Sequence, residues 1–174
     1  MALETDLSAP LRAVAADLDW DAVYAEHLPK VYNFFRYQLR NDAVAQDLTS
    51  VTFEKAWAAR SRYRRDLAGF GTWLLAIARN AAIDHHRSHR EHALLDDVDP
   101  AIDPSSPEED ETLTSDRKRL AALLATLPER DRELLALKYG AGATNRAIAT
   151  ITGLSETNVG TIIHRAVQTL RRDW

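Results

Sequence analysis

The chain has 174 residues, of which 45% are hydrophobic and 28% are charged; its net charge is −4 and it contains no cysteine. This composition is typical of a soluble globular protein, and it excludes disulfides, thiol catalysis and thiolate metal sites. No apolar run approaches the roughly 18 residues of a membrane-spanning helix, and residues 1–10 lack the pattern of a secretory signal. We therefore expect a cytoplasmic protein without membrane insertion.

Charge is segregated along the chain. Residues 20–92 have a net charge of +3 and residues 117–174 of +5, whereas residues 93–116 contain nine acidic and no basic residues. Basic blocks attract phosphate, and an acidic segment is repelled by it. The pattern is compatible with two nucleic-acid-binding blocks and equally with two solvated surfaces joined by an acidic linker.

The first basic block is predicted to be helical. Apolar residues recur every three or four positions over residues 21–40, where Pro29 predicts a kink or two short helices. A second helix is expected over residues 42–60, a basic loop over 61–71, and a third helix over 72–92 with Thr72 as its N-cap. The inward stripe of the second helix is expected to comprise Ala45, Leu48, Thr49, Phe53 and Trp57.

Residues 93–115 are predicted to be a linker, because prolines block a helix and neighbouring acids repel each other. Helices are expected over 116–127, 128–139 and 144–150, and a last helix from the N-cap Ser155 to residue 171. No segment alternates with a period of two. The expected fold is all-α: a tail (1–19), a helical domain (20–92), the acidic flexible linker (93–115) and a second helical domain (116–174).

Residues 144–170 have the layout of a helix-turn-helix, because a short helix, a turn containing Gly153 and a longer amphipathic helix follow in order. Such a motif presents the start of its second helix to the major groove of duplex DNA, where the helix dipole also favours phosphate. The candidates for DNA contact are Arg146, Ser155, Thr157, Asn158, Thr161, His164 and Arg165.

Two groups of motifs resemble one family, the bacterial sigma-70 factors. The stretches LPERDRELLALKY (127–139) and GLSETNV (153–159) are similar to sigma region 4. The stretches YAEHLPKVY (24–32), DLTSVTFEKAW (47–57) and FGTWLLAIARNAAIDHHR (70–87) are similar to sigma region 2, in the family's order. The chain thus resembles a small extracytoplasmic-function sigma factor, a promoter-recognising subunit of RNA polymerase that carries out no catalysis.

The resemblance implies partners and roles. In this family, region 2 binds the clamp of the largest polymerase subunit and captures the melted −10 strand. Region 4 reads the −35 element and binds the flap of the second-largest subunit. An anti-sigma factor commonly masks the surfaces of both regions. No cofactor and no metal are implied. The polymerase-binding candidates are Asp47, Thr49, Ser50, Phe53, Glu54 and Trp57. The −10 candidates are Arg62, Tyr63, Arg64, Arg65, Phe70, Arg79, Asn80, His86, Arg87 and Arg90.

The chemistry of these residue types agrees with those roles. The 61–71 loop interleaves cations with aromatic rings, a combination that binds phosphates and stacks on unpaired bases. Asn80 offers both a donor and an acceptor to a base edge. Trp73 is expected to pack in the core, because an aromatic residue at helical spacing usually does.

Three positions depart from the family pattern: Gly160 and Ile162 stand where basic residues are frequent, and Ala147 where a glutamate is usual. They predict a different or weaker −35 preference, although Gly160 is equally compatible with close packing.

Three other functions remain open. One is a dimeric helix-turn-helix regulator that acts without polymerase, and another is an adaptor whose basic surfaces are incidental. The third is a metal-dependent hydrolase, because His85, His89 and His92 have a spacing that permits zinc.

Overall fold

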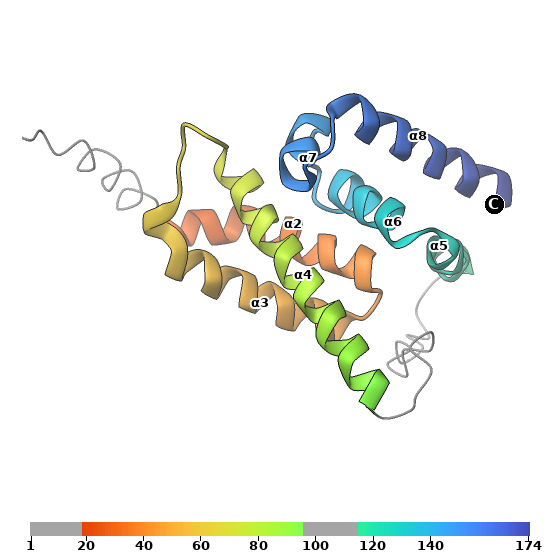
Figure 1. Cartoon of the computed structure of the whole chain (residues 1–174), viewed down its shortest axis with the longest axis horizontal. Coiled ribbons are helices and arrows are strands. Elements are labelled where there is room, and N and C mark those ends of the chain that lie inside the picture. The colour runs from red at the N-terminus through yellow and green to blue at the C-terminus, as the bar shows by residue number, and fades with distance from the viewer. Residues whose placement is uncertain (1–18, 96–114) are drawn as a thin grey trace, which may run out of the picture.

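The computed structural model describes residues 19–95 and 115–174, without the side chains of residues 92–95 and Arg117. All regular structure within these ranges is helical, which confirms the all-α prediction (Figure 1). The tail and residues 96–114 of the expected linker lie outside the described residues. No helix in the described ranges is long and apolar enough to cross a membrane.

Helix α2 (Trp20–Leu39) begins at Asp19, whose side chain accepts hydrogen bonds from the backbone of Asp21 and Ala22. The helix is continuous through Pro29, so the prediction of two short helices was wrong. Buried side chains precede and follow the proline, among them His27 and Val31, and their packing holds both halves in one helix.

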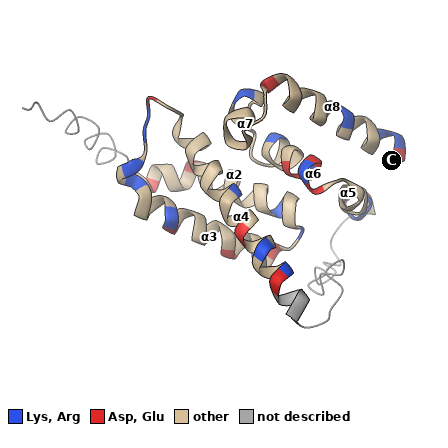
Figure 2. Cartoon of the chain, viewed as in Figure 1, with Lys and Arg blue, Asp and Glu red and all other residues tan. Residues whose placement is uncertain are grey.

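Helices α3 (Asp42–Ala59) and α4 (Phe70–Leu95) complete an N-terminal module with α2. A 3₁₀ turn, η1 (Arg60–Arg62), and a loop connect the two helices. Helix α4 begins at Phe70 rather than at the predicted cap Thr72, and it continues three residues beyond the expected end at His92. Figure 2 marks in blue the arginine positions on the loop between α3 and α4.

The C-terminal module contains α5 (Ser115–Thr126), α6 (Glu129–Leu135), a π-helical turn η2 (Ala136–Gly140), α7 (Asn145–Thr152) and α8 (Glu156–Asp173). In η2 the backbone N–H of Ala141 donates to the carbonyl of Ala136, five residues earlier, at 3.0 Å. Gly142 and Gly153 adopt positive φ angles of 69° and 75° and turn the chain into and out of α7. Glycine adopts this conformation without steric cost.

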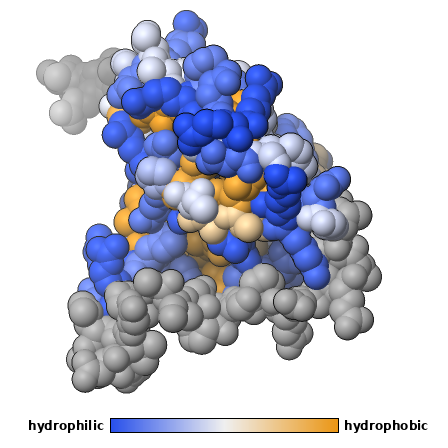
Figure 3. Space-filling model, turned by 90° about the vertical axis from the view of Figure 1, so that its right-hand side faces the viewer, coloured by the Kyte–Doolittle hydropathy of each residue, from blue (hydrophilic) through white to orange (hydrophobic). Residues whose placement is uncertain are grey.

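The two modules pack against each other. Helix α4 lies between α3 on one side and α7 on the other, and α2 packs against η2 and α6 (Figure 1). The buried hydrophobic side chains of both modules form one continuous cluster, from Val31 and Phe34 in α2 to Ile148 in α7 and Val159 in α8. On the face seen in Figure 3, hydrophobic side chains gather centrally within a mostly hydrophilic surface.

Candidate nucleic-acid interface

The helix-turn-helix of the C-terminal module is formed by α7 and α8. Thr144 and Ser155 cap the two helices, because their hydroxyls accept hydrogen bonds from the backbone of Ala147 and Asn158, each at 3.1 Å. Val159, Ile162, Ile163 and Ala166 bury one face of α8. The side of α8 that the sequence predicted to face outward is exposed at Thr157, Asn158, Thr161, His164 and Arg165.

The departures from the family pattern have different structural settings. Ile162 is 4% exposed and lies in the core, so this position does not offer a side chain to DNA. A Cβ on Gly160 would meet only the Asn145 amide nitrogen, at 3.5 Å, so packing does not demand glycine there. Arg146 is exposed, and its Nε lies 3.6 Å from a carboxylate oxygen of Glu156.

A cluster of aromatic rings supports the basic loop of the N-terminal module. Tyr63 is 5% exposed and its ring contacts Phe70 and Trp73, with ring centroids 5.3 and 5.2 Å apart. Burial also raises the pKa of the Tyr63 hydroxyl. Tyr63 therefore supports the loop from beneath instead of offering a surface for a base, and Trp73 packs against the core as predicted.

The cations of the loop lie on the surface. Arg62, Arg64 and Arg65 are exposed. Arg64 pairs with Asp66 at 2.6 Å, and this hydrogen bond lowers the pKa of the Asp66 carboxyl. The guanidinium of Arg60 lies over the ring of Trp57, 4.1 Å from its centroid. The loop and the adjoining end of α3 thus combine exposed cations with the half-exposed ring of Trp57, and surfaces that bind single-stranded DNA have this composition.

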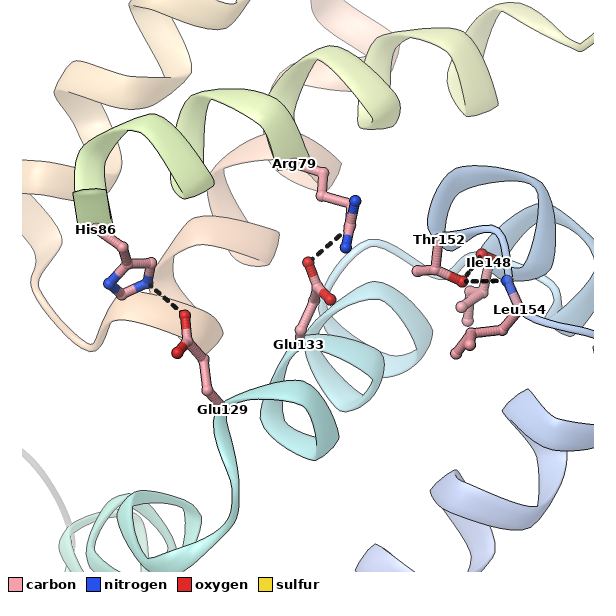
Figure 4. A network of polar contacts seen from close by, with 7 residues as sticks. All are labelled: Arg79, His86, Glu129, Glu133, Ile148, Thr152 and Leu154. Carbon is pink, nitrogen blue, oxygen red and sulfur yellow. Dashed lines mark hydrogen bonds and ion pairs between the residues drawn. The ribbon is translucent and has the colours of Figure 1, made fainter. Parts of the chain in front are cut away.

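The candidates on α4 divide into two sets. Asn80, Arg87 and Arg90 are exposed. Arg79 points toward the C-terminal module, where its Nε donates to a carboxylate oxygen of Glu133 at 2.8 Å (Figure 4). His86 points the same way, with its Nε2 3.6 Å from a carboxylate oxygen of Glu129. Sequence reasoning missed both glutamates, because a pair that is 54 residues apart leaves no local pattern.

The polymerase-binding candidates of α3 are only partly exposed. Asp47, Ser50 and Glu54 are exposed as predicted. Thr49 and Phe53 are 4% and 8% exposed, which fits the predicted inward stripe but leaves neither side chain accessible to a binding partner. The Thr49 hydroxyl donates to the Ala45 carbonyl at 2.6 Å, which allows the helix to bury it.

Trp57 is the reverse case. It was expected in the inward stripe of α3, yet it is 49% exposed. It lies near the end of α3, where its ring contacts Trp20 edge-on with centroids 5.0 Å apart.

The histidines of α4 show no metal geometry within the described residues. The rings of His85 and His89 stack with centroids 6.0 Å apart, and the side chain of His92 lies outside the described part. No group of three histidine, aspartate or glutamate side chains among the described residues is arranged to hold a metal ion.

Comparison with protein families gives two matches. Residues 23–92 match the model described as Sigma-70 region 2, and residues 117–170 match the model described as Sigma-70, region 4. The first match spans the N-terminal module from α2 to α4, and the second spans the C-terminal module from α5 to α8.

Relatives at about 30% identity match along most of this chain. The ECF RNA polymerase sigma factor BldN of Streptomyces coelicolor is 30% identical over 92% of this chain and 62% of its own length. The RNA polymerase sigma factor CarQ of Myxococcus xanthus is 30% identical over 87% of both chains. The chain therefore spans less than two thirds of BldN but most of CarQ.

A solved structure shares the fold. The sigma factor RpoE of Bartonella quintana, crystallised in complex with the anti-sigma factor NepR, superposes with a TM-score of 0.75. The alignment has 23% identity and covers 89% of this chain and 96% of RpoE.

Proposed function

The chain belongs to the sigma-70 family of RNA polymerase sigma factors, within its extracytoplasmic-function group, and we propose that it directs promoter-specific transcription initiation. The observation that carries this proposal is the presence of both sigma regions in one chain, each with exposed polar or cationic side chains on a helix that can approach DNA. A duplex-binding regulator needs only the helix-turn-helix and leaves the N-terminal module without a role.

The C-terminal module is proposed to read the −35 element. The exposed start of α8 presents Thr157, Asn158 and Thr161, followed by His164 and Arg165 one turn further on. Hydroxyl, amide and guanidinium groups on one helix face suit hydrogen bonds to base edges and phosphates in the major groove. Arg146 and the capped end at Ser155 add phosphate contacts.

The N-terminal module is proposed to capture the −10 strand after melting. Arg62, Arg64 and Arg65 would bind phosphates, while Asn80 would read an unstacked base. Arg87 and Arg90 extend the cationic surface along α4, whereas Arg79 is paired with Glu133. The buried ring of Tyr63 packs against the partly buried ring of Phe70, and the two rings hold the loop in place instead of stacking on DNA.

The proposed partners are the core RNA polymerase and an anti-sigma factor. The exposed residues Asp47, Ser50 and Glu54 of α3 would bind the clamp of the largest subunit, and the C-terminal module the flap of the second-largest. The proposal places the protein in the cytoplasm, where the bacterial polymerase and chromosome are, and gives it no catalytic reaction, metal or cofactor.

Reconstitution with core RNA polymerase tests the proposal. The full chain should co-purify with core enzyme, and sequencing of the transcripts that the complex makes on genomic DNA should reveal start sites that share upstream elements. An Arg165→Ala variant should still bind core enzyme but initiate less often at those sites. A chain that never joins core enzyme and initiates nowhere, yet binds duplex DNA as a dimer, would favour the conventional regulator.

A further inference from the structure

Two arginines lie near each other where the end of α2 packs against α6. Arg40 directly follows the last residue of α2, and Arg132 lies in the middle of α6. Burial lowers the pKa of the Arg132 guanidinium, the carboxylate of Glu129 opposes this shift, and the positive charge of Arg40 adds to it. Like charges at this distance repel each other, so the pair is electrostatically incomplete without an added negative charge.

The donors of this pair are unsatisfied within the described residues. The Nε atoms of Arg40 and Arg132 are both buried, and neither has a hydrogen-bond partner there. Both side chains as a whole are half-buried, so water reaches only a part of each guanidinium. A buried donor on a charged group costs free energy until an acceptor binds it. The junction of α2 and α6 therefore presents donors that a ligand could satisfy.

The acids of the same region are engaged elsewhere. A carboxylate oxygen of Asp42, at the start of α3, lies 3.3 Å from Nε of Arg36. A carboxylate oxygen of Glu129, at the start of α6, lies 3.6 Å from Nε2 of His86 (Figure 4). Neither acid forms an ion pair with the two arginines of the junction, so the surrounding side chains in the described ranges do not supply the missing negative charge.

The backbone at Arg40 is in a left-handed conformation, with φ 60° and ψ 24°. No other residue except glycine has a positive φ in the described parts of the chain. Glycine adopts this conformation without steric cost and is the usual residue after a helix end, whereas a residue with a Cβ is strained there. Strain of this kind is concentrated at functional sites, where the side chain has a role that offsets it. The strain at Arg40 thus indicates a role for its guanidinium.

We propose that Arg40 and Arg132 form a binding site for a small phosphate-bearing anion. Each guanidinium presents a planar fork of donors that matches two oxygens of a phosphate, so two forks can hold one tetrahedral dianion. The dianion neutralises both cations, whereas a carboxylate would compensate only one of them. Free phosphate and the phosphate groups of a nucleotide share this chemistry. The site contains none of the residues proposed to bind DNA or polymerase, so it stands independently of the proposed function.

Thermal unfolding of the full chain tests the site. The probes are inorganic phosphate and guanosine diphosphate, each titrated until the unfolding midpoint stops rising. A ligand that binds only the folded chain, at tenfold its dissociation constant, should raise the midpoint by about 3–6 °C. Sodium chloride at the same ionic strength is the reference, because exposed charges respond to salt alone.

Two variants locate the response. Arg132→Gln and Arg40→Gly should each abolish the rise in the unfolding midpoint that phosphate produces. Arg40→Gly should also raise the midpoint measured without phosphate, because glycine relieves the left-handed strain. A lost response in this variant therefore cannot come from a failure to fold. The matched control Arg172→Gln removes an exposed arginine of α8 and should keep the full response to phosphate.

The outcomes separate the site from general salt effects. A response that both variants lose and the control keeps supports the site, and the probe that acts at the lower concentration shows whether free phosphate or a nucleotide is the better occupant. The proposal is overturned if neither probe acts beyond sodium chloride, or if the unchanged chain and both variants respond equally. These measurements need no polymerase, so their result does not depend on whether the chain directs transcription.

Discussion

The two candidate DNA-binding surfaces differ in how accessible their proposed contact residues are. On α8 the side chains proposed to read duplex DNA are all exposed, and Ser155 and the buried face of the helix hold them in register. On the N-terminal module Tyr63 is buried and Arg79 is paired with a carboxylate of the other module. The candidate duplex-reading residues are therefore exposed on a capped helix, whereas part of the candidate strand-binding set is buried or already paired within the protein.

Phe34→Ala should have the largest effect and tests whether the surfaces belong to one folding unit. Phe34 is fully buried in α2, and removing its ring should cost about 3–5 kcal/mol of unfolding free energy. Because the cores of both modules are continuous, urea should unfold the whole chain in one transition by circular dichroism and by tryptophan fluorescence. Leu67→Ala, at a 72% exposed position, should change stability by less than about 0.5 kcal/mol. Two separate transitions would mean that the modules fold independently.

Asn80→Ala should impair binding of one DNA element and not of the other. Loss of its amide should weaken holoenzyme binding to a melted −10 strand by about 1–3 kcal/mol and leave binding of a −35 duplex unchanged. Arg165→Ala should show the opposite pattern and reduce the salt dependence of duplex binding. Fluorescence anisotropy with the two DNA fragments measures both. An equal loss on both fragments would contradict the division of labour.

Ser155→Ala tests the preformed state of α8. Its hydroxyl caps the helix through the Asn158 backbone, so removing it should cost about 1 kcal/mol of stability and weaken −35 duplex binding. Ser61→Ala, at an exposed position in η1, is the matched control and should leave both quantities unchanged. Duplex binding that survives the loss of the cap would show that DNA itself orders the start of α8.

Gly160→Ala should have the smallest effect, with the opposite sign. A Cβ at this position meets one amide nitrogen at an ordinary 3.5 Å, so alanine should raise the unfolding free energy by up to about 1 kcal/mol through helix propensity. Gly140→Ala provides the contrast, because its Cβ would meet Tyr37 at 2.8 Å and should lower stability. The thermal unfolding midpoints of the two variants, compared with that of the unchanged chain, show whether each substitution raises or lowers stability. If Gly160→Ala lowered stability instead, the space around residue 160 would be more crowded than the 3.5 Å contact implies.

Local signals predicted the helices well and the surfaces less well. Thr144 and Ser155 combine a capping hydroxyl with a following amphipathic pattern, and both cap helices in the structure. Of the two outcomes predicted from Pro29, a division into two helices was wrong, because the packing of neighbouring buried side chains holds α2 together. Thr49 is buried as the predicted inward stripe requires, with its hydroxyl bonded to its own helix, whereas Trp57 is exposed because a ring near a helix end can reach past the core.

The arrangement of the modules was beyond sequence reasoning. The charge segregation suggested two separate basic blocks, and the 93–115 segment suggested independence between them. The contact depends on a carboxylate, Glu133, inside a stretch whose family resemblance indicated only region 4, and on Gly140, which directly follows the helix predicted over 128–139. Each residue has a local explanation, and only the three-dimensional structure shows their second role.

The π-helical turn η2 also sets the rotational phase of everything that follows it. Its five-residue hydrogen-bond spacing accommodates one more residue than an α-helical turn. Deleting one residue between Ala136 and Gly140 would restore regular winding and rotate the downstream chain by about 100° relative to α6. Such a shortened chain would keep every side chain of its reading helix, yet α8 would point in a different direction from the rest of the molecule. The extra residue in the turn η2 therefore sets the orientation of α8 relative to α6.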